Sequence, residues 1–161
     1  MKNTDLLKDK KILIVDDEKD ILESLSDLLP MCRIKTASCF AEAKSLLESE
    51  TFDLAILDIM GVDGYALLDM VGKIGLTAVM LTAHALTPQD VLESYNKGAA
   101  FYIPKEELTN ITTYLQDVLE AKEKGKNSWG RWFERLGSYF DKKFGPDWRE
   151  EEREIWKSIK Y

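Results

Sequence analysis

Five polar residues stand at the ends of apolar segments, and their side chains suit phosphoryl chemistry. Asp16 and Asp17 follow the first such segment, Asp58 and Thr82 end two others, and Lys105 follows the last. Three carboxylates that converge repel one another strongly unless a cation lies between them. Mg²⁺ binds oxygen ligands and shares them with phosphate oxygens, so it is the expected ion. A carboxylate oxygen can attack phosphorus to form an acyl phosphate, while a hydroxyl and an ammonium hold the phosphoryl oxygens.

Each of these residues also has a plainer interpretation when it is taken alone. An Asp after a strand, such as Asp17, is often only the cap of the next helix. Asp58 alone is compatible with a loop, Thr82 with a β-branched strand former, and Lys105 with a solvated charge. Taken together, however, the carboxylates, the hydroxyl and the ammonium occur in this order at the ends of four segments. This combination favours one common site over four unrelated residues.

The elements that must position these residues follow from the hydrophobic pattern. Short apolar runs predict buried parallel strands, and runs with helical spacing separate them. Strands are expected at 11–16, 33–37, 52–58, 76–82 and 100–103, and helices at 18–29, 41–47, 65–71, 88–98 and from about 106 onward. This alternation predicts a flavodoxin-like doubly wound sheet of order 2-1-3-4-5, with helices on both faces. Ligands bind such sheets at the carboxyl ends of strands one and three, where the strand order reverses.

Four segments of the chain resemble the motifs of response-regulator receiver domains, over about 110 residues in the range 10–121. The matching segments are 12–18 (ILIVDDE), 54–58 (LAILD), 79–84 (VMLTAH) and 98–105 (GAAFYIPK). The resemblance implies that Asp58 accepts a phosphoryl group from a histidine kinase, a phosphotransfer protein or a small phosphodonor. It also implies that Asp16 and Asp17 bind Mg²⁺ together with Asp58 and the backbone carbonyl of Met60.

The remaining motif positions acquire roles by the same resemblance. Thr82 and Lys105 would contact the phosphoryl group, and Tyr102 would be the aromatic residue that moves inward when Thr82 does. Met60 and His84 occupy positions that tune the lifetime of the phosphoryl group in this family, although His84 is equally compatible with a surface residue that borders the site.

Two departures from the family pattern concern the loop after Asp58 and the residues around Lys105. Residues 59–64 (IMGVDG) form a loop about two residues shorter than usual, without its proline, which affects how the Met60 carbonyl is aimed. Lys105 follows Pro104 and precedes Glu106, which places Glu106 where it could compete with a phosphoryl group for the lysine.

Charge and cysteine content exclude several functional classes. Residues 1–121 hold 11 Lys/Arg against 21 Asp/Glu, an acidic balance that argues against nucleic-acid binding. The two cysteines and the single histidine neither form a disulfide framework nor suggest a zinc site. Because the chain shows no signal-peptide core and no apolar run near the roughly 20 residues that span a bilayer, we expect a cytoplasmic protein.

Residues 122–161 form a segment of different composition, which we expect to be a helical tail. All four tryptophans lie here, at positions 129, 132, 148 and 156. Ser128 is a candidate cap for a first helix with an aromatic stripe from Trp129 to Phe144, and a second helix is expected from Asp147. About forty residues cannot easily build a core, so three partners remain open. They are a homodimer or a downstream protein target, the receiver domain itself, and a membrane surface.

Two further functional hypotheses compete with a phosphorylation switch. One is a phosphorylation-independent interaction scaffold that keeps the receiver shape, which the short loop favours and the intact Asp58, Thr82 and Lys105 oppose. The other is a metal-dependent phosphohydrolase for external substrates, for which the sequence offers no separate general base. We therefore expect no enzymatic activity beyond phosphorylation and dephosphorylation of the chain itself.

Overall fold

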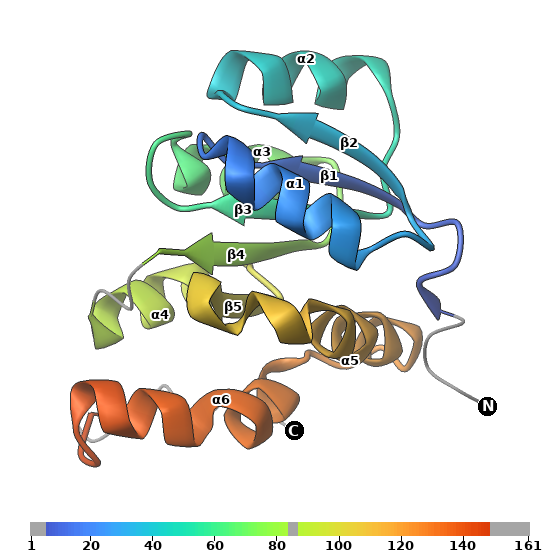
Figure 1. Ribbon diagram of the computed structural model, residues 1–161. Helices are drawn as coiled ribbons and strands as arrows, with labels where there is room; N and C mark the ends of the chain where they lie inside the picture. Colours follow the sequence, from blue (N-terminus) through green and yellow to red (C-terminus); the bar gives the residue numbers. More distant parts are fainter. Residues whose placement is uncertain (1–5, 84–86, 149–161) are drawn as a thin grey trace.

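A single parallel sheet forms the centre of the molecule (Figure 1). The computed structural model describes residues 6–83 and 87–148. The strands are β1 (Lys11–Val15), β2 (Arg33–Ala37), β3 (Leu54–Asp58), β4 (Ala78–Thr82) and β5 (Phe101–Pro104). Their order is β2-β1-β3-β4-β5, and every neighbouring pair is parallel. The predicted fold class and strand order are confirmed.

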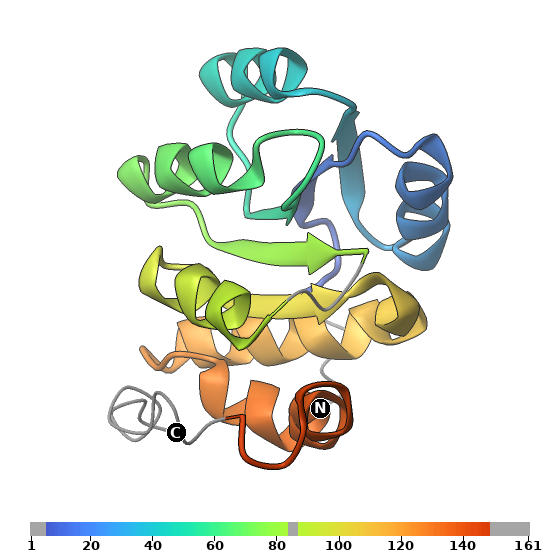
Figure 2. The same cartoon turned by 90° about the vertical axis from the view of Figure 1, so that its left-hand side faces the viewer.

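Helices cover both faces of this sheet (Figures 1 and 2). The helices are α1 (Lys19–Leu28), α2 (Phe40–Ser49), α3 (Gly64–Lys73), α4 (Pro88–Asn96), α5 (Ile111–Glu123) and α6 (Trp129–Phe144), with a 3₁₀ helix, η2, at Lys105–Asn110. Helices α1 and α5 pack together on one face, whereas α2 and α3 pack together with α4 beyond them on the other. Among the described residues, no helix is long and apolar enough to cross a membrane.

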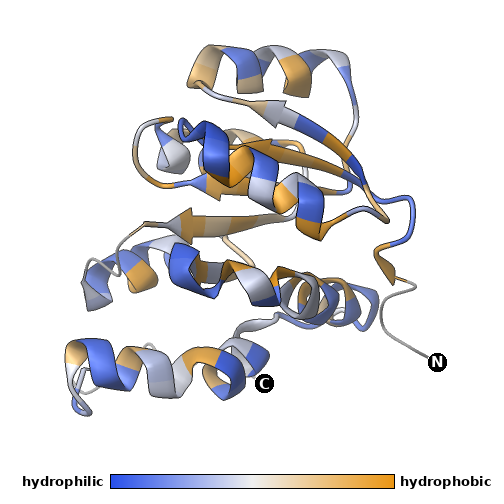
Figure 3. Cartoon of the chain, viewed as in Figure 1, coloured by the Kyte–Doolittle hydropathy of each residue, from blue (hydrophilic) through white to orange (hydrophobic). Residues whose placement is uncertain are grey.

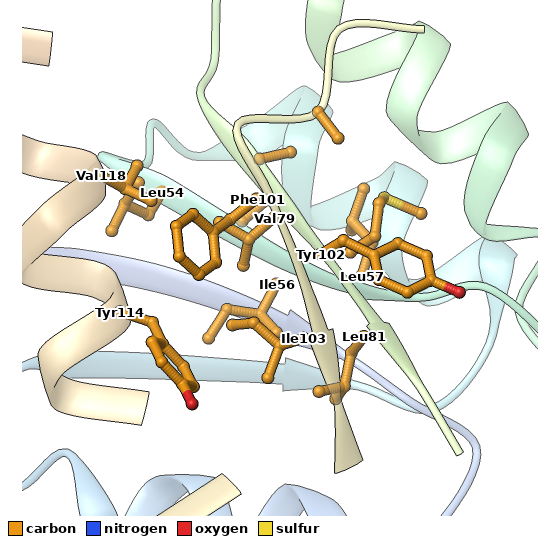
Figure 4. Close-up of a cluster of buried hydrophobic side chains, with 14 of the residues drawn as sticks. Leu54, Ile56, Leu57, Val79, Leu81, Phe101, Tyr102, Ile103, Tyr114 and Val118 are labelled. Atoms are coloured by element: carbon orange, nitrogen blue, oxygen red, sulfur yellow. The ribbon is translucent and has the colours of Figure 1, made fainter. Parts of the chain in front are cut away.

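The central strands are apolar because both faces of the sheet are covered. Every residue of β3, β4 and β5 is buried. Consecutive residues of β5 point to opposite faces, so the Phe101 ring packs against Tyr114 of α5 while the Tyr102 ring lies on the other side (Figure 4). This alternation gives β5 one residue toward α5 and the next toward the surface that α6 covers.

The structure differs from the sequence-based expectation after β5. A continuous helix from about residue 106 is wrong, because Lys105–Asn110 forms a 3₁₀ helix and α5 begins only at Ile111. Glu107 leaves helical geometry at φ −105° and ψ 15°, which interrupts an α-helical hydrogen-bond ladder at that point.

The two predicted helix caps have different outcomes. The Thr87 hydroxyl accepts a hydrogen bond from the Asp90 N–H, with Pro88 in the first turn, which confirms this helix start. Ser128 makes no cap, because its hydroxyl donates instead to the Ala100 carbonyl just before β5. The second tail helix was expected from Asp147; Asp147 and Trp148 lie in a turn, and its remaining residues, like His84, lie outside the described residues.

Helix α6 lies against the β5 side of the molecule, beneath α4, β5 and α5 in both ribbon views (Figures 1 and 2). Apolar and hydrophilic residues alternate along this helix (Figure 3), and Arg131, Glu134, Lys142 and Lys143 are exposed. The buried side chains are Trp129, Trp132, Leu136 and Phe140. Of the three partners considered for the tail, the structure therefore shows residues 128–148 packed on the receiver domain.

Candidate functional site

The carboxyl ends of β1 and β3 meet where the strand order reverses, and they bring Asp16 and Asp58 together. Val15 of β1 pairs with Leu57 of β3, so the next residue of each segment, Asp16 and Asp58, lies at the same edge of the sheet. Both carboxylate residues are buried, at 0% and 3% exposure. Asp17 is exposed beside them.

Lys105 links the acidic residues of this edge. Its ammonium lies 2.8 Å from Asp16 Oδ2 and 3.5 Å from Asp58 Oδ1, and its side chain is only 9% exposed. The ammonium also donates to Glu18 Oε1 at 2.8 Å. A buried cation between two buried carboxylates offsets part of their desolvation cost. The structure therefore gathers Asp16, Asp58 and Lys105 as the sequence predicts, and adds Glu18.

The competition expected from Glu106 is instead made by Glu18. The Glu106 carboxylate accepts a hydrogen bond from Tyr139 of α6 and lies 3.5 Å from the Lys143 ammonium. The contact of Glu18 with Lys105 joins residues 87 positions apart in the sequence. The only signal for it in the sequence is that Glu18 directly follows the Asp16-Asp17 pair.

Burial and like charge make ionisation of the Asp58 carboxyl costly. Desolvation, together with the Asp16 and Asp17 carboxylates, raises the pKa of Asp58 to about 7, although Lys105 opposes the shift. Desolvation also raises the pKa of Asp16 above its usual value, against the hydrogen bond from Lys105. An ion that neutralises this edge of the sheet would therefore favour the ionised, nucleophilic form of Asp58.

The raised pKa of Asp58 predicts a pH-dependent stability for the metal-free protein. Above its usual value of 3.8 and up to about 7, the folded chain holds a proton that the unfolded chain has released. The free energy of unfolding therefore falls as the pH rises through this window. Asp58→Asn should lose less stability than the wild type between about pH 4 and about pH 7, measured by urea unfolding in EDTA.

Asp63→Asn is the matched control for this experiment, because Asp63 is an exposed carboxylate in the loop that follows Asp58. This variant should keep the wild-type pH dependence. Parallel pH profiles for the wild type and Asp58→Asn would contradict the prediction.

The short loop after β3 passes close to Asp17. A Cβ atom on Gly61 would lie 2.4 Å from Asp17 Oδ2, and Gly61 has a φ of +82°. Both facts explain why glycine stands at this position. The Met60 side chain in the same loop is 66% exposed, as expected for a residue that would offer only its backbone carbonyl.

Thr82 and Tyr102 lie on the two neighbouring strands of this half of the sheet. Leu81 pairs with Asp58, so Thr82 stands one position beyond the carboxylate, and it is 2% exposed. Tyr102 is fully buried, and its ring centroid lies 5.8 Å from that of Phe140 in α6. Their roles in switching stay predictions, but the contact between Tyr102 and the tail was not foreseen.

The donor set at this edge suits a hard cation. Carboxylate oxygens of Asp16, Asp17 and Glu18 lie within 4.8 Å of one another, and Asp58 Oδ1 lies 3.5 Å from the Lys105 ammonium beside them. Oxygen-only donors of this kind are what Mg²⁺ prefers. The sequence-based set named Asp58 and Met60 with the first two residues, so Glu18 is an additional oxygen donor beside them.

The fold and this edge together define a flavodoxin-like α/β protein with acidic residues at its topological switch point. A family model of the response regulator receiver domain matches residues 12–116. The chain belongs to this family.

Curated relatives support the same assignment over the receiver part. The two-component response regulator ARR12 of Arabidopsis thaliana is 34% identical over 128 residues, which cover 73% of this chain and 21% of the relative. The transcriptional activator protein PfeR of Pseudomonas aeruginosa is 32% identical over 99 residues, which cover 59% of this chain and 32% of the relative. The chain thus spans less than a third of the length of these two relatives.

Solved receiver structures match the fold as well. A CheY-like receiver domain protein of Methanospirillum hungatei has a TM-score of 0.60 and 30% identity, covering 71% of this chain and 99% of that chain. The BeF3-activated receiver domain of DrrB has a TM-score of 0.56 and 27% identity, covering 65% of this chain and 95% of that chain. The receiver part of this chain is therefore similar to a domain known in a fluoroberyllate-activated form.

Proposed function

We propose that this chain is a phosphorylation switch in a two-component system, with Asp58 as the phosphoryl acceptor. The observation that carries the proposal is the position of the Asp58 carboxylate, which is buried at the end of β3 and lies 3.5 Å from the Lys105 ammonium. The donor is a histidine kinase or phosphotransfer protein, in keeping with the family. Phosphorylation changes which proteins the chain binds.

The chemistry follows from the groups at the site. An ionised Asp58 oxygen attacks phosphorus, the bond from phosphorus to the donor nitrogen breaks, and an acyl phosphate forms on Asp58. The Lys105 ammonium and the Thr82 hydroxyl hold equatorial oxygens of the transferring group. Bound Mg²⁺ supplies charge neutralisation for those oxygens and for the carboxylates of Asp16, Asp17 and Asp58, with the Met60 carbonyl as a further ligand. We infer no turnover of external substrates.

Intact-protein mass after treatment with acetyl phosphate tests the proposal directly. The wild type should gain one phosphoryl group in Mg²⁺ and none in EDTA, because the dianion needs the cation at the acidic edge. Asp58→Asn should gain none under either condition, and Asp63→Asn should behave as the wild type.

Binding of fluoroberyllate provides an independent measurement that needs no phosphodonor. A folded wild type that binds neither phosphoryl nor fluoroberyllate in Mg²⁺ would overturn the proposal and favour the scaffold hypothesis. An adduct that persists in Asp58→Asn would place the acceptor elsewhere.

A further inference from the structure

Helix α6 covers an edge of the sheet that would otherwise expose unpaired carbonyl groups. β5 is the last strand of the sheet, so one side of its backbone has no strand partner. The Trp129 indole N–H donates to the Ala99 carbonyl at 2.9 Å, and the Trp132 indole N–H donates to the Tyr102 carbonyl at 2.7 Å. Both hydrogen bonds are buried, so α6 provides donors for one carbonyl of β5 and for one carbonyl just before the strand.

The same helix also holds the segment that follows β5. Tyr139 donates a hydrogen bond to the Glu106 carboxylate, and the Lys143 ammonium lies 3.5 Å from it. Glu106 directly follows Lys105, whose ammonium lies in the acidic site. Helix α6 therefore binds segment 102–106 at both of its ends, through Tyr102 and Glu106, and Lys105 lies within this segment.

An ion pair on α5 fixes the register of the docked helix. Arg135 of α6 reaches Asp117 with two hydrogen bonds, from Nε to Oδ2 at 2.9 Å and from a terminal nitrogen to Oδ1 at 3.2 Å. Asp117 is 3% exposed, so loss of its cation would leave a buried charge poorly compensated. The second cation near it is Arg131, at 3.6 Å.

From these contacts we infer that α6 is an internal ligand that stabilises the arrangement in which Lys105 pairs with Glu18 and Asp16. Phosphorylation of Asp58 then weakens the docking of α6, and docked α6 in turn opposes phosphorylation. This inference rests on the proposed function of Asp58. It assigns to the tail a regulatory role at that same site.

The physical reason is competition for one ammonium group. The Lys105 ammonium lies 2.8 Å from Glu18 Oε1 and 3.5 Å from Asp58 Oδ1, so a dianion on Asp58 attracts it away from Glu18. In the proposed coupling, segment 102–106 adjusts with the lysine. The hydrogen bonds to Tyr102 and Glu106 are made in the arrangement with the Glu18 contact, so they favour it. By linkage, the phosphoryl group and docked α6 must lower each other's affinity by the same factor.

The tryptophans report on the tail alone, because all four lie beyond residue 128. In the full chain with Mg²⁺, adding fluoroberyllate should increase quenching of tryptophan fluorescence by acrylamide and speed amide hydrogen exchange across α6. Asp58→Asn should show neither change.

Variants of the ion pair test the reciprocal effect. Arg135→Gln should bind fluoroberyllate more tightly than the wild type, by about 5–150-fold if the coupling is of ordinary size. Arg135→Lys, which keeps the charge but not the bidentate geometry, should fall between them. Lys142→Gln is the matched control, since Lys142 is exposed on the same helix and should leave the affinity unchanged.

The outcomes separate this inference from the proposed function. Fluoroberyllate binding that leaves tryptophan quenching and hydrogen exchange unchanged, with equal affinity in Arg135→Gln, would overturn the coupling while Asp58 remains the acceptor. Weaker binding in Arg135→Gln would overturn the stated direction. No fluoroberyllate binding by any folded variant would overturn the acceptor role itself, and the coupling with it.

Discussion

Replacing Gly64 with alanine should lower the free energy of unfolding by about 3 kcal/mol, at the upper end for overpacked sites. A Cβ atom on Gly64 would lie 2.1 Å from the Asp58 carbonyl oxygen and 2.8 Å from the Ile59 Cα. These atoms belong to the backbone and cannot turn aside as a flexible side chain can. Because the displaced backbone is that of Asp58, phosphoryl uptake should fall as well. Urea unfolding and intact-protein mass measure the two effects.

Gly72→Ala is the matched control in the same helix. A Cβ atom on Gly72 would meet nothing within 4 Å, so the substitution should stabilise α3 by about 0.5–1 kcal/mol. Equal unfolding free energies for Gly64→Ala and the wild type would show that the loop between β3 and α3 is not closely packed at Gly64.

Trp132→Ala is expected to have the second large effect, because this side chain joins α6 to the sheet. Trp132 is fully buried, contacts the rings of Trp129, Phe140 and Trp148, and donates to the Tyr102 carbonyl. Truncation of such a residue costs about 3–5 kcal/mol. We expect α6 to detach before the sheet unfolds, so hydrogen exchange should show the loss first in residues 129–144.

Two further variants separate the ring of Trp132 from its N–H group. Trp132→Phe keeps an aromatic ring but leaves the Tyr102 carbonyl without this donor, at a cost of about 1–3 kcal/mol. Phe133→Ala removes a half-buried ring from the neighbouring position and should cost much less than Trp132→Ala. Equal protection of α6 in Trp132→Ala and the wild type would contradict the packing of α6 on β5.

The strands and their order were predictable because the signals for them are local. Runs such as 54–57 are apolar throughout, as is typical of a strand covered on both faces, and the intervening helical patterns favour parallel pairing. The polar residues at the strand ends then had to meet at one edge. Asp16 and Asp58 were located from the sequence for this reason, while their chemical roles remain proposals.

Contacts that depend on side-chain reach across the fold were not predictable. The sequence around Lys105 indicated its neighbour Glu106 as a partner. In the structure the lysine instead pairs with Glu18, which lies 87 positions earlier in the sequence. Helical periodicity also extended the last receiver helix back to residue 106, because it detects neither the non-helical geometry of Glu107 nor the change from 3₁₀ to α geometry at Ile111.

The sequence by itself determined the sheet, its acidic edge and the amphipathic character of α6, since each depends on spacing along the chain. Only the tertiary structure decided what covers the aromatic face of α6. A stripe of tryptophans satisfies its need for burial equally well on a second protein, a membrane or its own domain. The choice depends on the Ala99 and Tyr102 carbonyl groups, which accept hydrogen bonds from the two indoles, and on the buried Asp117, which accepts hydrogen bonds from Arg135.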